Sequence, residues 1–105
     1  MKESTLKNFV RESAVLRSAA RHWLGTLRKA RWREPMDIKK SFGAADMLGN
    51  GSNRVVFDLG GNRARMICKY DFRTNWVHMH ICWLGIHKEY DEVCRKGLQY
   101  TIFVY

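Results

Sequence analysis

The sequence has one proline, three cysteines and no long run of apolar residues. Because a membrane-spanning helix needs about 20 predominantly apolar residues, the absence of such a run excludes a transmembrane segment. The first ten residues also lack the apolar core of a secretory signal, so we expect a cytoplasmic protein with no membrane partner. The cysteines are odd in number and lack CxxC spacing, which argues against a disulfide framework and a tetrahedral zinc site. We expect reduced, mostly buried thiols at Cys68, Cys82 and Cys94.

Acidic residues are also scarce. Ten Asp and Glu stand against 19 Lys and Arg, which gives a formal net charge of +9 at pH 7. The excess is concentrated in residues 1–40, which hold eleven Lys and Arg against four Asp and Glu. Such a field attracts polyanions, so RNA, DNA, an acidic protein and an anionic membrane are all compatible with it. Charge alone therefore leaves the class of partner open.

The residues that are present predict a single α+β domain over residues 1–105. Apolar residues recur at three-to-four spacing over residues 12–31, which is typical of one face of an amphipathic helix. Pro35 is expected to end this helical region or to begin the next, and residues 37–42 predict a short helical turn. Whether a further short helix occupies residues 6–10 stays open.

The second half of the chain predicts an antiparallel meander followed by a short helix. Glycines and polar residues indicate a loop first, and alternation of apolar and polar residues indicates each strand. The expected elements are a loop over 43–53, strands over 54–59, 63–71 and 77–84, turns at 60–62 and 73–75, a helix over 87–96 ending at Gly97, and a last edge strand over 98–105.

Alternation also predicts which side chains share a face. In the second strand the apolar face comprises Ala64, Met66, Cys68 and Tyr70, and the cationic face comprises Arg63, Arg65, Ile67 and Lys69. In the third strand one face comprises Val77, Met79, Ile81 and Trp83, and the other comprises His78, His80, Cys82 and Leu84. We expect one face of the sheet to pack on the N-terminal helices and the other to be free.

Two segments together resemble a known family. The first reads GGNRARMI from residue 60, and the second reads GIHKEYD from residue 85. With an alternating strand between them, they resemble the HigB toxins of the RelE superfamily. The resemblance covers residues 32–91. Its main positions are Phe57, Gly60, Gly61, Asn62, Arg65, His87, Glu89, Tyr90 and Asp91, with a further pattern at Asp37, Lys40, Phe42, Ala45 and Asp46.

The resemblance implies N-terminal helices packed on a small antiparallel sheet and the activity of an mRNA endonuclease, often on the translating ribosome. It implies a HigA-like antitoxin with a helix-turn-helix domain. The toxin would contact operator DNA only through this antitoxin. It also implies metal-independent cleavage without a cofactor, in which a ribose 2′-hydroxyl attacks the adjacent phosphate. The sequence departs from the family at its apolar, aromatic C-terminal end (97–105) and its longer N-terminal leader.

By position, the resemblance assigns the catalytic roles to Arg65 and His87. Internal attack needs removal of the 2′-hydroxyl proton, stabilisation of a phosphorane and protonation of the leaving oxygen. The imidazole of His87 can perform the first or the third task near neutral pH. The guanidinium of Arg65 can offer a two-pronged donor to phosphate oxygens. The alternatives are a surface or capping histidine, and an arginine paired with Asp58 or Asp71.

A further set of side chains is expected to position RNA: Arg63, Lys69, Lys88, Tyr90, His78 and His80. Tyr90 has packing of the last helix as its alternative, and Arg63 and Lys69 have solubility. Trp76 and Phe72 either stack bases or cap the core. No carboxylate or further cysteine completes a ligand set with His78, His80 and Cys82, so we expect no metal.

Two further alternatives concern the whole chain. The basic series Arg17, Arg21, Arg28, Lys29, Arg31 and Arg33 is either the solvated face of a helix or a surface that docks on ribosomal RNA. The protein itself is either an endoribonuclease or a non-catalytic module that binds RNA or an acidic protein. A membrane-surface protein that uses its basic helix is a third alternative.

Overall fold

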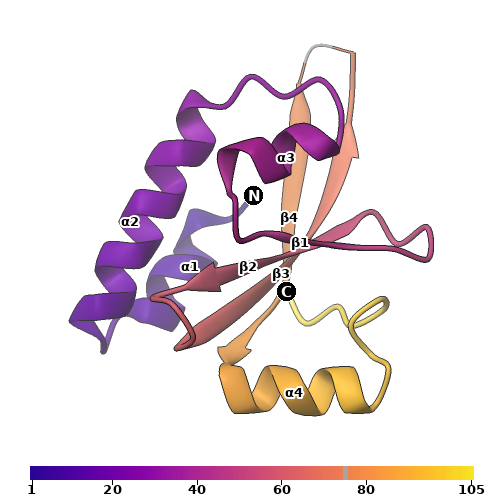
Figure 1. Cartoon of the computed structure of the whole chain (residues 1–105). Coiled ribbons are helices and arrows are strands. Elements are labelled where there is room, and N and C mark those ends of the chain that lie inside the picture. The colour runs from indigo at the N-terminus through magenta and orange to yellow at the C-terminus, as the bar shows by residue number, and fades with distance from the viewer. Residues whose placement is uncertain (75) are drawn as a thin grey trace.

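A computed structural model of the chain describes residues 1–74 and 76–105, so Asn75 of the predicted second turn lies outside the described residues. Figure 1 shows the helices α1 and α2 on one side of the sheet, and α4 on the other side. The elements are α1 (Glu3–Val10), α2 (Ala14–Lys29), α3 (Met36–Ser41), β1 (Asp46–Leu48), β2 (Arg54–Leu59), β3 (Ala64–Phe72), β4 (Val77–Ile86) and α4 (His87–Arg95). The predicted α+β fold is confirmed.

The N-terminal helices form where apolar periodicity and capping agree. Helix α2 begins after Ser13, whose hydroxyl accepts a hydrogen bond from the backbone N–H of Leu16 at 3.2 Å. It buries Trp23 and Leu24 in the core. The question of an earlier helix is settled by α1, which buries Leu6 and Val10.

The four strands form one antiparallel sheet in the order β1-β2-β3-β4. The glycines of the β2–β3 turn adopt φ values of +62° at Gly60 and +68° at Gly61, which glycine tolerates best. This turn extends through Arg63, so the prediction that Arg63 belongs to the strand face of Arg65 was wrong. The predicted loop over 43–53 also contains β1, a strand of three residues, which is too short to show alternation.

A β-bulge in β4 overturns the predicted faces of that strand at Trp83 and Leu84. Ile67 of β3 lies opposite Trp83, and the next residue of β3 lies opposite Ile81, which leaves Cys82 as an extra residue. Trp83 therefore shares a face with Cys82, while Leu84 packs in the core beneath the helices. The alternation that predicted the opposite arrangement fails because a bulge shifts every later side chain to the other face.

The second face of the sheet is covered, contrary to prediction. Helix α4 and residues 98–105, here called the tail, lie over it, and a second apolar cluster forms beneath them. This cluster comprises Val56, Ile67, Cys82, Trp83 and Val93, with Leu48, Tyr90 and Ile102 at its margin. Covering this face buries apolar side chains that a free face would expose to water.

The tail is not the predicted edge strand. Its only backbone hydrogen bond to the strands described here runs from the N–H of Val104 to the carbonyl of Cys82, at 2.8 Å. Instead, the guanidinium of Arg54, which is only 4% exposed, donates to the carbonyls of Gln99 and Ile102. The tail therefore crosses the sheet face, because a buried cation holds its backbone there.

Two further findings concern the whole chain. Cys68 and Cys82 are buried and Cys94 is partly buried, all three as free thiols, which confirms the prediction for the cysteines. Among the described residues, none of the helices combines the length and the apolar character that a membrane crossing requires.

Candidate active site and RNA-binding surface

Arg65 lies near the start of β3, between Asp58 of β2 and Gly85 of β4. Its side chain is 11% exposed, and its Nε lies 3.1 Å from Oδ1 of Asp58. Nη1 donates to the carbonyls of Gly61 and Ala64 at 3.3 Å, and Nη2 donates to Oδ1 of Asn62 at 3.1 Å. The guanidinium thus fixes the β2–β3 turn. Three of its five N–H groups donate hydrogen bonds to protein acceptors, and Nε forms an ion pair with Asp58.

His87 is the first residue of α4, directly after β4. Its backbone N–H donates to the carbonyl of Arg63 at 3.3 Å, which holds the start of α4 against the β2–β3 turn. Its imidazole Nε2 lies 3.6 Å from Oδ2 of Asp91, one helical turn later, and the side chain is 46% exposed. An accessible imidazole beside a carboxylate can exchange a proton with a bound group.

Tyr90 places a phenol between α4 and the sheet. Burial is the main cause that raises its pKa well above the ordinary tyrosine value, and the neighbouring Cys94 and Asp46 raise it further. Arg65 is close enough to act in the opposite direction, by stabilising the phenolate. A phenol with a raised pKa remains protonated at neutral pH. It can therefore donate a hydrogen bond, and the raised pKa makes it a weaker acid than an ordinary tyrosine.

A tight packing arrangement supports this end of the sheet. The indole of Trp83 lies over Gly85, where an added Cβ would come within 2.5 Å of the ring, and its centroid is 6.1 Å from that of Tyr90. The carboxylate of Glu89 accepts a hydrogen bond from the backbone N–H of Ile86 at 2.9 Å, which caps the first turn of α4. The glycine therefore sets how closely the indole can approach β4.

The other predicted RNA-binding residues separate into two places. Arg63 lies in the β2–β3 turn and Lys88 is exposed in the first turn of α4, so both are near His87. A cavity of about 450 Å³ at the other end of β3 is lined by Lys69, His78 and His80. Arg65 and Lys69 are four residues apart, or about 13 Å along the strand. The structure therefore does not bring all the predicted residues into one surface.

The tail closes one side of this cavity. The ring of Phe103 stacks on His80 with centroids 4.7 Å apart and an interplanar angle of 11°. Nε2 of His80 also lies 2.9 Å from the carbonyl oxygen of Tyr105. Both contacts occupy His80, so of the three predicted residues in this cavity Lys69 and His78 are exposed and His80 is partly buried.

Four residues near these sites were not singled out as site residues from the sequence. Asp58 and Gly85 flank Arg65, Asp91 lies beside His87, and Arg54 holds the tail. The i, i+4 spacing of His87 and Asp91 on a predicted helix was a usable signal. The burial of Arg54 had no such signal. In the predicted strand 54–59, Arg54 alternates with Val55, Phe57 and Leu59, and its face of the sheet was expected to be free. Within residues 1–74 and 76–105, no three His, Cys, Asp or Glu side chains are grouped so that they could hold a metal ion.

The helices, the antiparallel sheet and the C-terminal helix define an α+β protein of RelE-like architecture. The family model HigB_toxin, described as the RelE-like toxic component of a toxin-antitoxin system, matches residues 16–93. The chain belongs to this family, which confirms the resemblance seen in its sequence. It is a toxin of a toxin–antitoxin system, and its partner is accordingly an antitoxin. Among curated proteins, none matches the chain. The family match ends before the tail begins.

Proposed function

We propose that this toxin is a metal-independent endoribonuclease that cleaves mRNA, on the ribosome, by attack of the 2′-hydroxyl on the adjacent phosphate. The observation that carries the proposal is the position of His87 at the junction of β4 and α4, beside the turn that Arg65 fixes. An accessible imidazole, a guanidinium and a protonated phenol supply the base, the cation and the donor that this reaction needs.

The proposed step conserves atoms and protons. His87 accepts the proton of the 2′-hydroxyl while the 2′-oxygen bonds to phosphorus, and the bond from phosphorus to the 5′-oxygen breaks. The leaving 5′-oxygen takes a proton from an acid, for which Tyr90 is the candidate because its phenol is protonated at neutral pH and lies near Arg65, whose charge opposes the rise in its pKa. The products are a 2′,3′-cyclic phosphate and a 5′-hydroxyl.

Arg65 would act on the phosphorane through its charge and through the N–H groups that donate no hydrogen bond to the described residues. Asp58 and Asn62 hold its guanidinium in place, so its orientation costs little when RNA binds. Arg63 and Lys88 would bind flanking phosphates, because both are exposed cations beside His87. Asp91 would orient the imidazole of His87.

The partners follow from the same proposal. The toxin would engage mRNA in the ribosome, and a HigA-like antitoxin with a helix-turn-helix domain would neutralise it and bind the operator DNA.

One observation favours a second candidate, a non-catalytic RNA-binding module. Four protein contacts already engage the guanidinium of Arg65, as in a purely structural ion pair. In that case the basic surface would bind RNA, with strong salt dependence and without cleavage.

Induced expression in bacteria separates the two candidates. The endoribonuclease is expected to arrest growth, and His87→Ala is expected to abolish the arrest. His22→Ala is the matched control, because His22 is an exposed histidine on α2, away from this site. Arrest that persists in a folded His87→Ala variant would contradict the proposal. Harmless expression of the folded wild-type protein would favour the module.

A further inference from the structure

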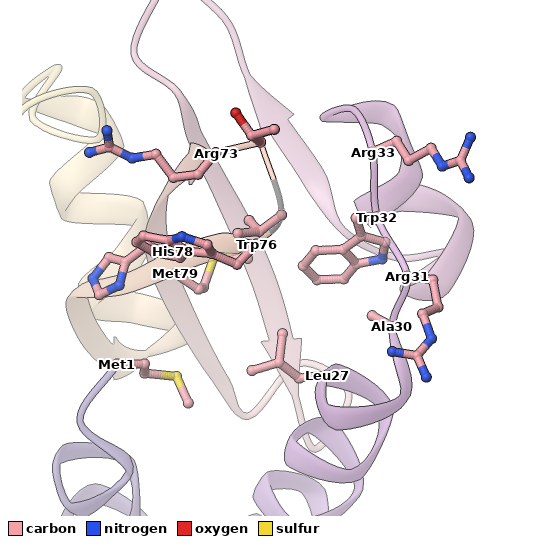
Figure 2. Close-up of a pocket in the computed structure, with 12 residues that line it drawn as sticks. Met1, Leu27, Ala30, Arg31, Trp32, Arg33, Arg73, Trp76, His78 and Met79 are labelled. Carbon is pink, nitrogen blue, oxygen red and sulfur yellow. The ribbon is translucent and has the colours of Figure 1, made fainter.

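A cavity of about 700 Å³ lies between the segment that follows α2 and the turn between β3 and β4. Figure 2 shows Trp32 on one wall and Trp76 on the other, with Leu27 and Met1 below them. The size falls within the range of ligand-binding cavities, about 300–1,000 Å³. The site proposed for cleavage lies at the opposite end of β3, a strand of nine residues that spans on the order of 25 Å.

The cavity is strongly cationic. Arg31, Arg33 and Arg73 line it together with His78, and no carboxylate is among the lining residues. Arg73 is paired with Asp71 at 2.7 Å. Neither Arg31 nor Arg33 forms an ion pair within the part of the chain that the structure describes. Figure 2 shows both on the side of Trp32, with the side chain of Arg33 extending away from the cavity. Such an arrangement suits an anionic ligand.

The two tryptophans add flat apolar surface to this charge. The indole N–H of Trp32 donates to Oγ of Ser41 at 2.8 Å, and its ring packs edge-to-face on Phe42 at 6.1 Å. Trp32 is therefore already held in place. Trp76 is 57% exposed, and Cζ of Arg73 lies 5.9 Å from the centre of its ring. An exposed tryptophan under a guanidinium can stack a base next to a bound phosphate.

We propose that this cavity, here called the Trp32–Trp76 cavity, binds single-stranded RNA, with bases stacked on the tryptophans and phosphates held by the arginines. Free bases can reach the rings, whereas the bases of a duplex stack on one another. Its position far from His87 makes it a second contact for RNA. The inference rests on the proposed function for the choice of RNA as ligand, but the binding itself does not require cleavage.

The test measures binding of a fluorescein-labelled, eight-nucleotide, 2′-O-methyl RNA to the whole protein by fluorescence anisotropy. This probe has no free 2′-hydroxyl, so it stays intact. Trp76→Ala is expected to raise the Kd about 5- to 150-fold, which corresponds to the loss of one stacked base. The double variant Arg31→Glu/Arg33→Glu is expected to weaken binding and to reduce the slope of log K against log salt by about 1.4.

The control Arg17→Glu/Arg21→Glu carries the same change of charge on α2, at residues that do not line the cavity. Weakening by this control equal to that of Arg31→Glu/Arg33→Glu would overturn the proposal, because it would show a general field effect. Unchanged binding in Trp76→Ala would also overturn it. So would a competition experiment in which AMP displaces the labelled RNA at the same concentration as the unlabelled RNA does. A matching RNA duplex is expected to bind Trp76→Ala and wild type equally.

This result is separable from the outcome for the proposed function. Loss of cleavage in His87→Ala with unchanged RNA binding in Trp76→Ala would leave the endoribonuclease standing and remove the second site. If RNA binding depends on Trp76 but the wild-type protein cleaves no RNA, the second site would stand and the endoribonuclease would be removed.

Discussion

At the scale of single residues, Arg65 combines a structural and a proposed catalytic task. The same guanidinium contacts Asp58 and the β2–β3 turn and lies close enough to Tyr90 to influence its charge. Removing the side chain would leave Asp58 without its partner, so Arg65→Ala changes stability and activity together. A substitution that keeps the charge separates the two tasks.

We expect Arg65→Lys to lower the rate of RNA cleavage at least about tenfold, because a lysine cannot hold the turn and a phosphate with one planar fork. The unfolding free energy should fall much less than in Arg65→Ala, since the pairing with Asp58 persists. Cleavage rates and urea denaturation of both variants test this. A fully active Arg65→Lys variant would show that the guanidinium geometry is not used.

The raised pKa of Tyr90 predicts a dependence of stability on alkaline pH. The folded protein keeps the phenolic proton at pH values where the unfolded chain, with a tyrosine pKa of about 10, releases it. This contribution to stability is therefore complete below about pH 10 and is lost as pH rises through the folded value. In urea denaturation at pH 9 to 11, the unfolding free energy of wild type should fall more steeply than that of Tyr90→Phe. Equal slopes would contradict the burial of this phenol.

At the scale of elements, the sequence predicts regular structure better than irregular structure. Periodicity located α2 and α4, and glycines located the β2–β3 turn, because these signals are local. The bulge at Cys82 and the path of the tail depend on contacts between distant residues. Local alternation contains no information on either, so the covered face went unpredicted.

Two glycines give opposite predictions for the same substitution. In Gly85→Ala the new Cβ would come within 2.5 Å of the Trp83 ring, so we expect a loss of about 1–3 kcal/mol of unfolding free energy. Gly25 lies within α2 with nothing within 4 Å of an added Cβ, so Gly25→Ala should gain about 0.5–1 kcal/mol. Thermal or urea denaturation measures both. A stabilising Gly85→Ala would refute the packing described for Trp83.

The tail is expected to detach when its buried cation is removed. Arg54→Leu deprives the carbonyls of Gln99 and Ile102 of their donor, so amide hydrogen exchange should accelerate across residues 98–105. Cys82 lies beneath this segment and should become reactive toward a thiol reagent, while Cys68 in the other core stays protected. The control Arg73→Leu should change neither. Unchanged exchange in a folded Arg54→Leu variant would show that the tail is held by other contacts.

At the scale of the whole molecule, the layers determine which surface stays uncovered, and the charge determines what that surface attracts. The sheet carries helices on one face and α4 with the tail on the other, so the surface left for RNA lies at the two ends of β3. The net charge of +9 would attract RNA to both ends. His87 and Arg65 lie at one end, and the Trp32–Trp76 cavity lies at the other.

The most direct test of the account is the chemistry of the RNA ends produced by the purified toxin on ribosomes translating a defined mRNA. We predict a 2′,3′-cyclic phosphate and a 5′-hydroxyl, no cleavage where the scissile nucleotide is 2′-deoxy, and a rate at least about tenfold lower in His87→Ala. His22→Ala should cleave like wild type. Intact mRNA, or cleavage that persists at the wild-type rate in His87→Ala, would contradict the account.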